Sequence, residues 1–179
     1  MDRGGMDSTG EQISDALKSV FDKIEEKFGA RLLGSSVFRG ELTFLVAPED
    51  LVEVATYCKA PEGLGFDRLE FLTGNHYPER LEQPFEVAVQ LTSMATNDRL
   101  RLKVPLKEGQ KMPTLTSLWP AANWCERETW EMYGIEFEGH PNLIRLLTDA
   151  DFEGHPLRKD FPVRGLVGGR IRTDLKGKI

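Results

Sequence analysis

The residues best suited to chemistry in this chain are concentrated between positions 119 and 162. Two copies of one pentapeptide, Phe-Glu-Gly-His-Pro, start at Phe137 and Phe152 and place a carboxylate two residues before His140 and His155. Metal binding is the chemistry that such a repeat suggests. However, the proline after each histidine restricts that histidine to extended backbone, and the intervening glycine does not force the two side chains to converge. The repeat therefore favours two turns whose imidazoles bond backbone groups or carboxylates, and no metal site is predicted.

Other catalytic and cofactor-binding patterns are absent from the sequence. No serine lies in a Gly-x-Ser-x-Gly elbow, and neither a Walker loop nor a Gly-x-Gly-x-x-Gly turn follows a predicted strand. Cys58 and Cys125 have no partner at Cys-x-x-Cys spacing, so an iron–sulfur or zinc site is not expected. Glu126 and Glu128 point to different faces of a predicted helix, which argues against acid–base catalysis by this pair. We predict no catalytic, cofactor-binding or metal-binding residue.

Protein recognition is the chemistry that remains for this segment. Its charges are too numerous to be buried without partners, and they alternate with large aromatic and leucine side chains. An arginine can bind a carboxylate through two parallel hydrogen bonds, which fixes orientation as well as adding energy. An internal network that ties the segment to its own sheet is the alternative, and we expect both to occur. The predicted interface residues are Glu126, Arg127, Glu128, Trp130, Tyr133, His140, Arg145, His155, Arg158, Lys159 and Asp160.

The composition is that of an ordinary globular domain. The chain has 179 residues, 40% hydrophobic and 29% charged, and no apolar run approaches the roughly 20 residues that span a bilayer. Its net charge of −6 argues against nucleic acid as the main partner, because phosphate binding needs clustered cations. Residues 164–179 form a basic tail, for which anionic lipid headgroups, an acidic neighbouring subunit and plain solvation all remain open.

Hydrophobic spacing predicts the elements that position this segment. Helical periodicity follows capping signals at Ser8 and Thr9 and ends at Gly29, a second helix opens at 48–50 and continues to Cys58, and a third runs from about 120 to 133 with Gly134 as its stop. Strands are predicted at 37–38 and 42–46 around an Arg39-Gly40 turn, at 68–73, at 85–91 and at 100–106. The last two, joined by a turn at 96–98, form an antiparallel hairpin with one solvated face.

These elements predict an α+β fold. Two helices pack on a mostly antiparallel sheet, and a third helix and an irregular C-terminal docking segment follow. In this division residues 1–118 form the α+β body, 119–163 form the third helix and docking segment of the same domain, and 164–179 form the basic tail.

The third helix and the docking segment together resemble the signature of a known family. The chain from Glu126 to Leu147 reads Glu-Arg-Glu-x-Trp-x-x-Tyr-Gly-Ile-x-Phe-x-Gly-His-Pro-x-Leu-x-Arg-x-Leu. Residues 154–162 read Gly-His-Pro-Leu-Arg-Lys-Asp-Phe-Pro. This pattern resembles the 30-kilodalton subunit of respiratory complex I, the enzyme called NADH-quinone oxidoreductase in bacteria. Upstream of the signature the resemblance lies in the order of elements.

The resemblance implies a subunit without chemistry of its own. A member of this family sits in the hydrophilic arm on the cytoplasmic side of the bacterial inner membrane, attached only through the complex. It packs against the hydrogenase-like large subunit beside the quinone cavity, while other subunits hold FMN and iron–sulfur clusters and use NADH and quinone for proton pumping. Equivalent subunits occur in ferredoxin-fed NDH-type complexes, reduced-deazaflavin dehydrogenases and membrane-bound hydrogenases, which remain alternatives. A free-standing cytosolic enzyme with an unrecognised site is the alternative from another class.

Overall fold

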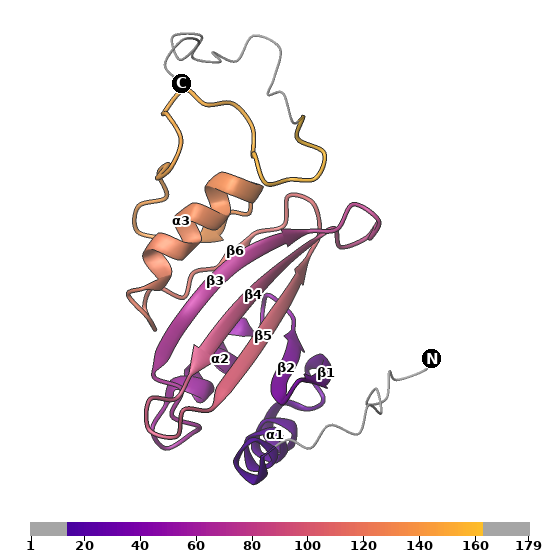
Figure 1. Cartoon of the computed structure of the whole chain (residues 1–179), viewed down its shortest axis with the longest axis vertical. Helices are drawn as coiled ribbons and strands as arrows, with labels where there is room; N and C mark the ends of the chain where they lie inside the picture. Colours follow the sequence, from indigo (N-terminus) through magenta and orange to yellow (C-terminus); the bar gives the residue numbers. More distant parts are fainter. Residues whose placement is uncertain (1–13, 163–179) are drawn as a thin grey trace, which may run out of the picture.

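A five-stranded mixed sheet organises the fold (Figure 1). The computed structural model describes residues 14–162. The strands are β1 (Leu32–Phe38), β2 (Glu41–Val46), β3 (Arg68–His76), β4 (Phe85–Thr92) and β5 (Arg99–Leu106), in the order β1-β2-β5-β4-β3. β2 and β5 are parallel, whereas the other neighbouring pairs are antiparallel. The predicted α+β class and the mostly antiparallel sheet are confirmed.

Two of the connections between antiparallel strands lie where turns were predicted. Arg39 and Gly40 both have positive φ, at 51° and 74°, which matches a two-residue hairpin turn between β1 and β2. Asn97, at φ 59°, turns the chain between β4 and β5. β3 is longer than the predicted 68–73, because it continues through Gly74 to His76.

Three helices accompany the sheet: α1 (Asp15–Phe28), α2 (Leu51–Lys59) and α3 (Ala122–Tyr133). Ser14 caps α1 by accepting from the backbone of Leu17, while the predicted capping signals at Ser8 and Thr9 lie outside the described residues. α1 ends at Gly29 as predicted, although this glycine keeps a helical φ of −51° and its N–H still bonds Glu25. Gly134 does end α3 with a left-handed residue, at φ 78°.

All three helices contribute to one core on the same face of the sheet. Phe21 of α1 stacks on Phe44 of β2, and the strand register carries that face across to Leu72 of β3. Gly74 lies on this face two residues later, and a Cβ there would be 2.7 Å from the ring of Tyr133 in α3. Figure 1 shows α1 and α2 at one end of the sheet and α3 towards the other. The third helix therefore extends the two-helix layer that was predicted.

The opposite face is polar yet largely buried. All eight residues of β4 are buried, so the predicted solvated face is wrong for this strand. Glu86 is only 3% exposed, with Arg80 Nη1 3.1 Å from one carboxylate oxygen and Lys103 Nζ 3.1 Å from the other. Gln90 accepts from Arg101 at 2.8 Å. Long charged side chains thus cover one another, which alternation of polar residues alone does not reveal.

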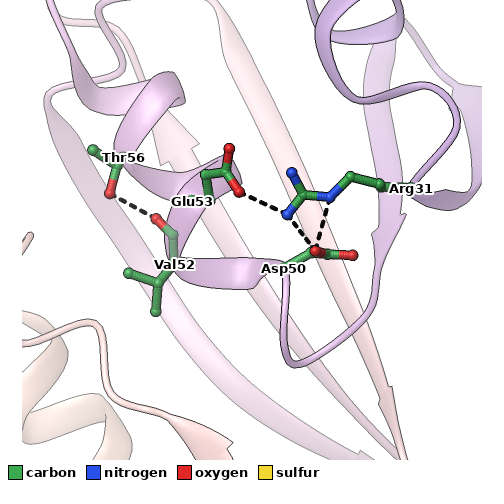
Figure 2. Close-up of polar contacts among 5 residues, drawn as sticks. All are labelled: Arg31, Asp50, Val52, Glu53 and Thr56. Atoms are coloured by element: carbon green, nitrogen blue, oxygen red, sulfur yellow. Dashed lines mark hydrogen bonds and ion pairs between the residues drawn. The ribbon is translucent and has the colours of Figure 1, made fainter.

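A small ion-pair cluster fastens the start of α2 to the turn after α1 (Figure 2). Arg31 donates through Nε to Asp50 at 2.9 Å and through Nη2 to Glu53 at 2.6 Å. Because Arg31 is 42% exposed, this cluster orients the two helices more than it stabilises them.

A second, two-stranded sheet lies beside α3, and the predictions missed it. β6 (Met112–Pro113) pairs in parallel with β7 (Phe137–Glu138), which is the start of the first pentapeptide. From residue 139 to 162 the chain forms turns and bends without helix or strand, as predicted for the docking segment. Within residues 14–162, no helix has the length and apolar character needed to span a membrane.

The contact between Gly74 and Tyr133 yields a prediction about stability. Gly74→Ala should lower the free energy of unfolding by about 1–3 kcal/mol, because the added methyl group would overlap the Tyr133 ring. Gly34→Ala is the matched control, since a Cβ at this strand glycine meets nothing within 4 Å. Urea unfolding of both variants measures the difference. Equal stability of the two variants would show that α3 does not pack this closely on β3.

Candidate functional site

The candidate site is built around α3, which holds two buried carboxylates of opposite character. Glu126 and Glu131 are both 0% exposed, whereas Glu128 is exposed. The prediction that Glu126 and Glu128 point to different faces is therefore confirmed. Ala122, Glu126 and Thr129 form the side of α3 that faces the core, and Glu131 faces the segment that follows.

Glu126 joins α3 to the chain that follows β6. Its Oε1 accepts from the backbone N–H of Leu115 at 2.7 Å, and its Oε2 accepts from Thr114 Oγ1 at 2.5 Å. Burial raises the pKa of Glu126 to about 7, although both hydrogen bonds act in the opposite direction. A protonated Glu126 can instead donate to Thr114.

Glu131 binds the backbone of the docking segment. Its two oxygens accept from the N–H groups of Leu146 at 2.6 Å, Leu147 at 3.0 Å and Thr148 at 2.6 Å, and also from the hydroxyl of Thr148 at 2.5 Å. Burial by itself raises the pKa of Glu131, but these hydrogen bonds outweigh burial and lower the pKa to about 2. Glu131 is therefore an ionised clamp at neutral pH.

The two pentapeptide histidines hold the same segment to the two ends of α3. His140 Nε2 lies 3.1 Å from the carbonyl of Asn123, and His155 Nδ1 lies 2.9 Å from the carbonyl of Glu131. Because a carbonyl only accepts, each ring nitrogen must donate there. The glycine before each histidine has positive φ, 82° at Gly139 and 86° at Gly154. The prediction of turns whose imidazoles bond backbone groups is confirmed.

Arg127 and Arg145 are also used inside the chain. Arg127 donates to the carbonyls of Ile144 and Arg145, both at 3.0 Å, and its guanidinium lies 5.3 Å from the centre of the Trp124 ring. Arg145 donates to Thr148 Oγ1 at 3.0 Å. Neither forms an ion pair with a carboxylate within residues 14–162.

Arg158 ties the end of the docking segment to the body. It donates to the carbonyl of Tyr133 at 2.6 Å and to Glu108 at 3.1 Å, and it lies 4.8 Å from the centre of the Phe85 ring. Its side chain is only 21% exposed. This arginine acts within the fold, which is the internal alternative considered for the charged residues.

Lys159 and Asp160 extend beyond this attachment. The backbone N–H of Lys159 donates to His76 Nδ1 at 3.0 Å, so this nitrogen carries no proton in the observed geometry. Asp160 Oδ1 is 3.8 Å from the same nitrogen and therefore does not form a charged pair there. Both side chains belong to exposed residues, and Asp160 is 66% exposed.

The aromatic members of the predicted set pack inward. Trp130 and Tyr133 are partly buried against the core, and burial raises the pKa of Tyr133.

The cysteines do not form a site. Cys58 is fully buried, and burial raises its pKa to about 12, whereas Cys125 is partly exposed. No group of three or more metal-ligating side chains comes together in the part of the chain that the structure describes.

The predicted residues thus gather around α3, but their charges mostly bond their own chain. Sequence reasoning missed Glu131 as a site residue. It also missed four exposed apolar side chains, which are Trp124 of α3 and Ile144, Leu147 and Leu157 of the docking segment. A signal for Glu131 was present, since it follows Arg127 by four positions on a helix whose other acids are predicted interface residues. No sequence signal separates exposed leucines from buried ones in an irregular segment.

Comparison with known proteins identifies the family of this chain. The family model described as respiratory-chain NADH dehydrogenase, 30 Kd subunit, matches residues 44–167. The chain belongs to this family. The NADH-quinone oxidoreductase subunit designated C from Methylobacterium sp. (strain 4-46) is 43% identical over 159 residues, covering 89% of this chain and 74% of that protein. The subunit of the same designation from Sinorhizobium medicae (strain WSM419) is 42% identical over 164 residues, covering 92% and 81%. The resemblance of the signature is confirmed.

Solved structures share the fold of this family member. "Nqo5 of the trypsin-resistant fragment (1-134) in P63 form" superposes with a TM-score of 0.62 at 28% identity, covering 72% of this chain and 99% of that chain. A chain of the membrane-bound sulfane sulfur reductase, an archaeal respiratory membrane complex, gives a TM-score of 0.70 at 22% identity, covering 84% and 87%. At that identity the second likeness shows the fold alone.

Glu126 gives the domain a predictable pH dependence. Its folded pKa of about 7 lies above the ordinary 4.5, so its ionisation destabilises the fold as pH rises from about 4.5 through 7. At 1.36 kcal/mol per pH unit the effect is about 3 kcal/mol. Glu126→Gln should therefore gain stability relative to wild type between pH 5 and pH 8 in urea unfolding. Glu128→Gln, at an exposed position, should show no such trend, and parallel curves for both variants would contradict the assignment.

Glu131 should behave in the opposite way. Because its folded pKa is lowered to about 2, its stabilising effect is complete above about pH 4.5 and disappears as pH falls towards 2. Glu131→Gln should cost roughly 1–3 kcal/mol at pH 7, since an amide cannot accept from three backbone N–H groups at once. Hydrogen exchange should then show the amides of residues 146–148 losing protection first. Unchanged protection there would contradict the clamp.

Proposed function

We propose that this chain is a non-catalytic subunit of a proton-pumping NADH-quinone oxidoreductase and braces the hydrogenase-like large subunit near the quinone site. Family membership and the relatives named as NADH-quinone oxidoreductase subunits support the parent complex. The bracing role rests on one observation, which is the internal fastening of residues 139–162 to α3. Glu131, His140, His155, Arg127 and Arg158 hold a segment without regular structure in a fixed shape.

Such a segment suits a scaffold. A surface that is ordered before binding loses less conformational entropy when it docks, so more of the contact energy appears as affinity. In this proposal the chain binds no cofactor, and the FMN, iron–sulfur clusters, NADH and quinone belong to other subunits. It lies on the cytoplasmic side of the bacterial inner membrane, contacts other hydrophilic-arm subunits as well, and reaches the membrane only through them.

An equivalent place in a related complex is the second candidate. The fold shared with the sulfane sulfur reductase chain shows that this architecture also occurs in another respiratory membrane complex. The names of the more similar relatives favour the NADH-dependent complex.

Affinity purification tests the proposal. With a tag on the N-terminus, the wild-type chain should recover a hydrogenase-like large subunit and flavin-bearing NADH subunits from gently solubilised membranes, as identified by mass spectrometry. Recovery of the same large subunit with a ferredoxin or hydrogenase module would favour the second candidate. A chain that purifies alone would contradict both, and catalysis by the isolated chain would favour a free-standing enzyme.

A further inference from the structure

One flank of α3 points away from the core. Trp124, Arg127, Glu128 and Glu131 recur at i, i+3, i+4 and i+7, so they share one side of the helix, where residues 146–148 bury Glu131. Ala122, Glu126 and Thr129 are buried on the other side. The outward flank therefore lies opposite the side that holds α3 to the sheet.

The docking segment borders this flank and adds apolar side chains to it. Arg127 bonds the carbonyl of Ile144 at 3.0 Å, and Glu131 bonds the N–H of Leu147 at 3.0 Å, so both residues lie next to the helix. Trp124 is 61% exposed, Ile144 51% and Leu147 62%. Large apolar side chains grouped in this way on an ordered surface mark an interaction site.

The charges around these side chains are predominantly acidic. Glu128, Asp149 and Asp151 are exposed, and none of their carboxylates has a hydrogen bond or ion pair within residues 14–162. The neighbouring cations Arg127 and Arg145 keep their positive charge, because the carbonyl and hydroxyl groups that they bond are neutral. With Glu131 also ionised, the four acids still outnumber these two cations, so the surface combines apolar side chains with an excess of negative charge.

We propose that the surface formed by Trp124, Glu128, Ile144 and Leu147 docks onto a neighbouring protein subunit with an apolar pocket and a basic rim. This inference rests on the proposed function and names the part of the chain that touches the large subunit. Trp124 enters the pocket, because tryptophan is enriched among the few interface residues that carry most of the binding energy. Glu128 faces a lysine or arginine of the partner. A lipid surface is disfavoured, since acidic edges repel anionic headgroups.

Two double variants test the surface through recovery of the complex. Trp124→Ala with Leu147→Ala should lower recovery of the large subunit at least tenfold, while the thermal unfolding of the isolated full chain stays unchanged because both side chains are exposed. The control is Phe38→Ala with Leu81→Ala, which removes side chains that are 65% and 93% exposed and belong neither to α3 nor to residues 139–162. The control should be recovered like wild type. Equal recovery of both double variants would overturn the inference.

Charge and shielding supply independent tests. Glu128→Lys should weaken recovery more than Glu128→Gln, and added salt should reduce that difference if a partner cation faces this position. In hydroxyl-radical footprinting, Trp124 should oxidise readily in the isolated full chain and be protected in the purified complex. Protection already present in the isolated chain would mean that the chain covers its own flank, which overturns the inference.

The outcomes also separate this inference from the function on which it rests. If the wild-type chain recovers no large subunit, the proposed function fails and the docking surface fails with it. If wild type recovers the large subunit and the Trp124 variant does so equally well, the function stands and only the surface is wrong.

Discussion

The buried carboxylate of Glu131 is the interaction on which the arrangement around α3 depends. Three consecutive backbone N–H groups of an irregular segment converge on it, and no regular element supplies an alternative acceptor for them. Unpaired buried N–H groups are costly, so the backbone conformation of residues 146–148 depends on this acceptor, while the two histidines and two arginines hold other parts of the segment. The side chains that the segment presents, including Leu147, take their positions from that contact.

The same helix shows how environment decides what a carboxylate does. Glu126 receives one backbone donor and one hydroxyl, too little to offset burial, and its pKa rises. Glu131 receives enough donors to offset burial, and its pKa falls. Both act as structural links, Glu126 towards β6 and Glu131 towards the docking segment. The positions of two glutamates five residues apart therefore fix α3 between the body and the segment that follows it.

Sequence patterns predicted the parts of the fold that local physics decides. The Arg39-Gly40 turn, the alternating strands and the Gly134 stop all follow from backbone conformation and hydrophobic period. The burial of Glu86 did not follow, because its partners Arg80 and Lys103 come from other parts of the chain. At the candidate site, sequence found most of the charged residues, but it missed Glu131 and did not identify the partners of the others. Bonds from Arg127 or Arg158 to backbone carbonyls have no signature, since every residue offers a carbonyl.

The internal use of these charges changes how an interface at this site should work. A cation already bonded within its own chain does not have to be stripped of water when a partner docks, and it contributes little direct attraction. Arg127 and Arg158 therefore affect binding through the shape of the segment. Affinity in the proposed interface must come from the side chains that remain exposed, which include apolar residues, several acids and Lys159. Charge density in the sequence thus locates the docking segment, whereas in the proposed interface its apolar residues are the ones expected to supply the contacts.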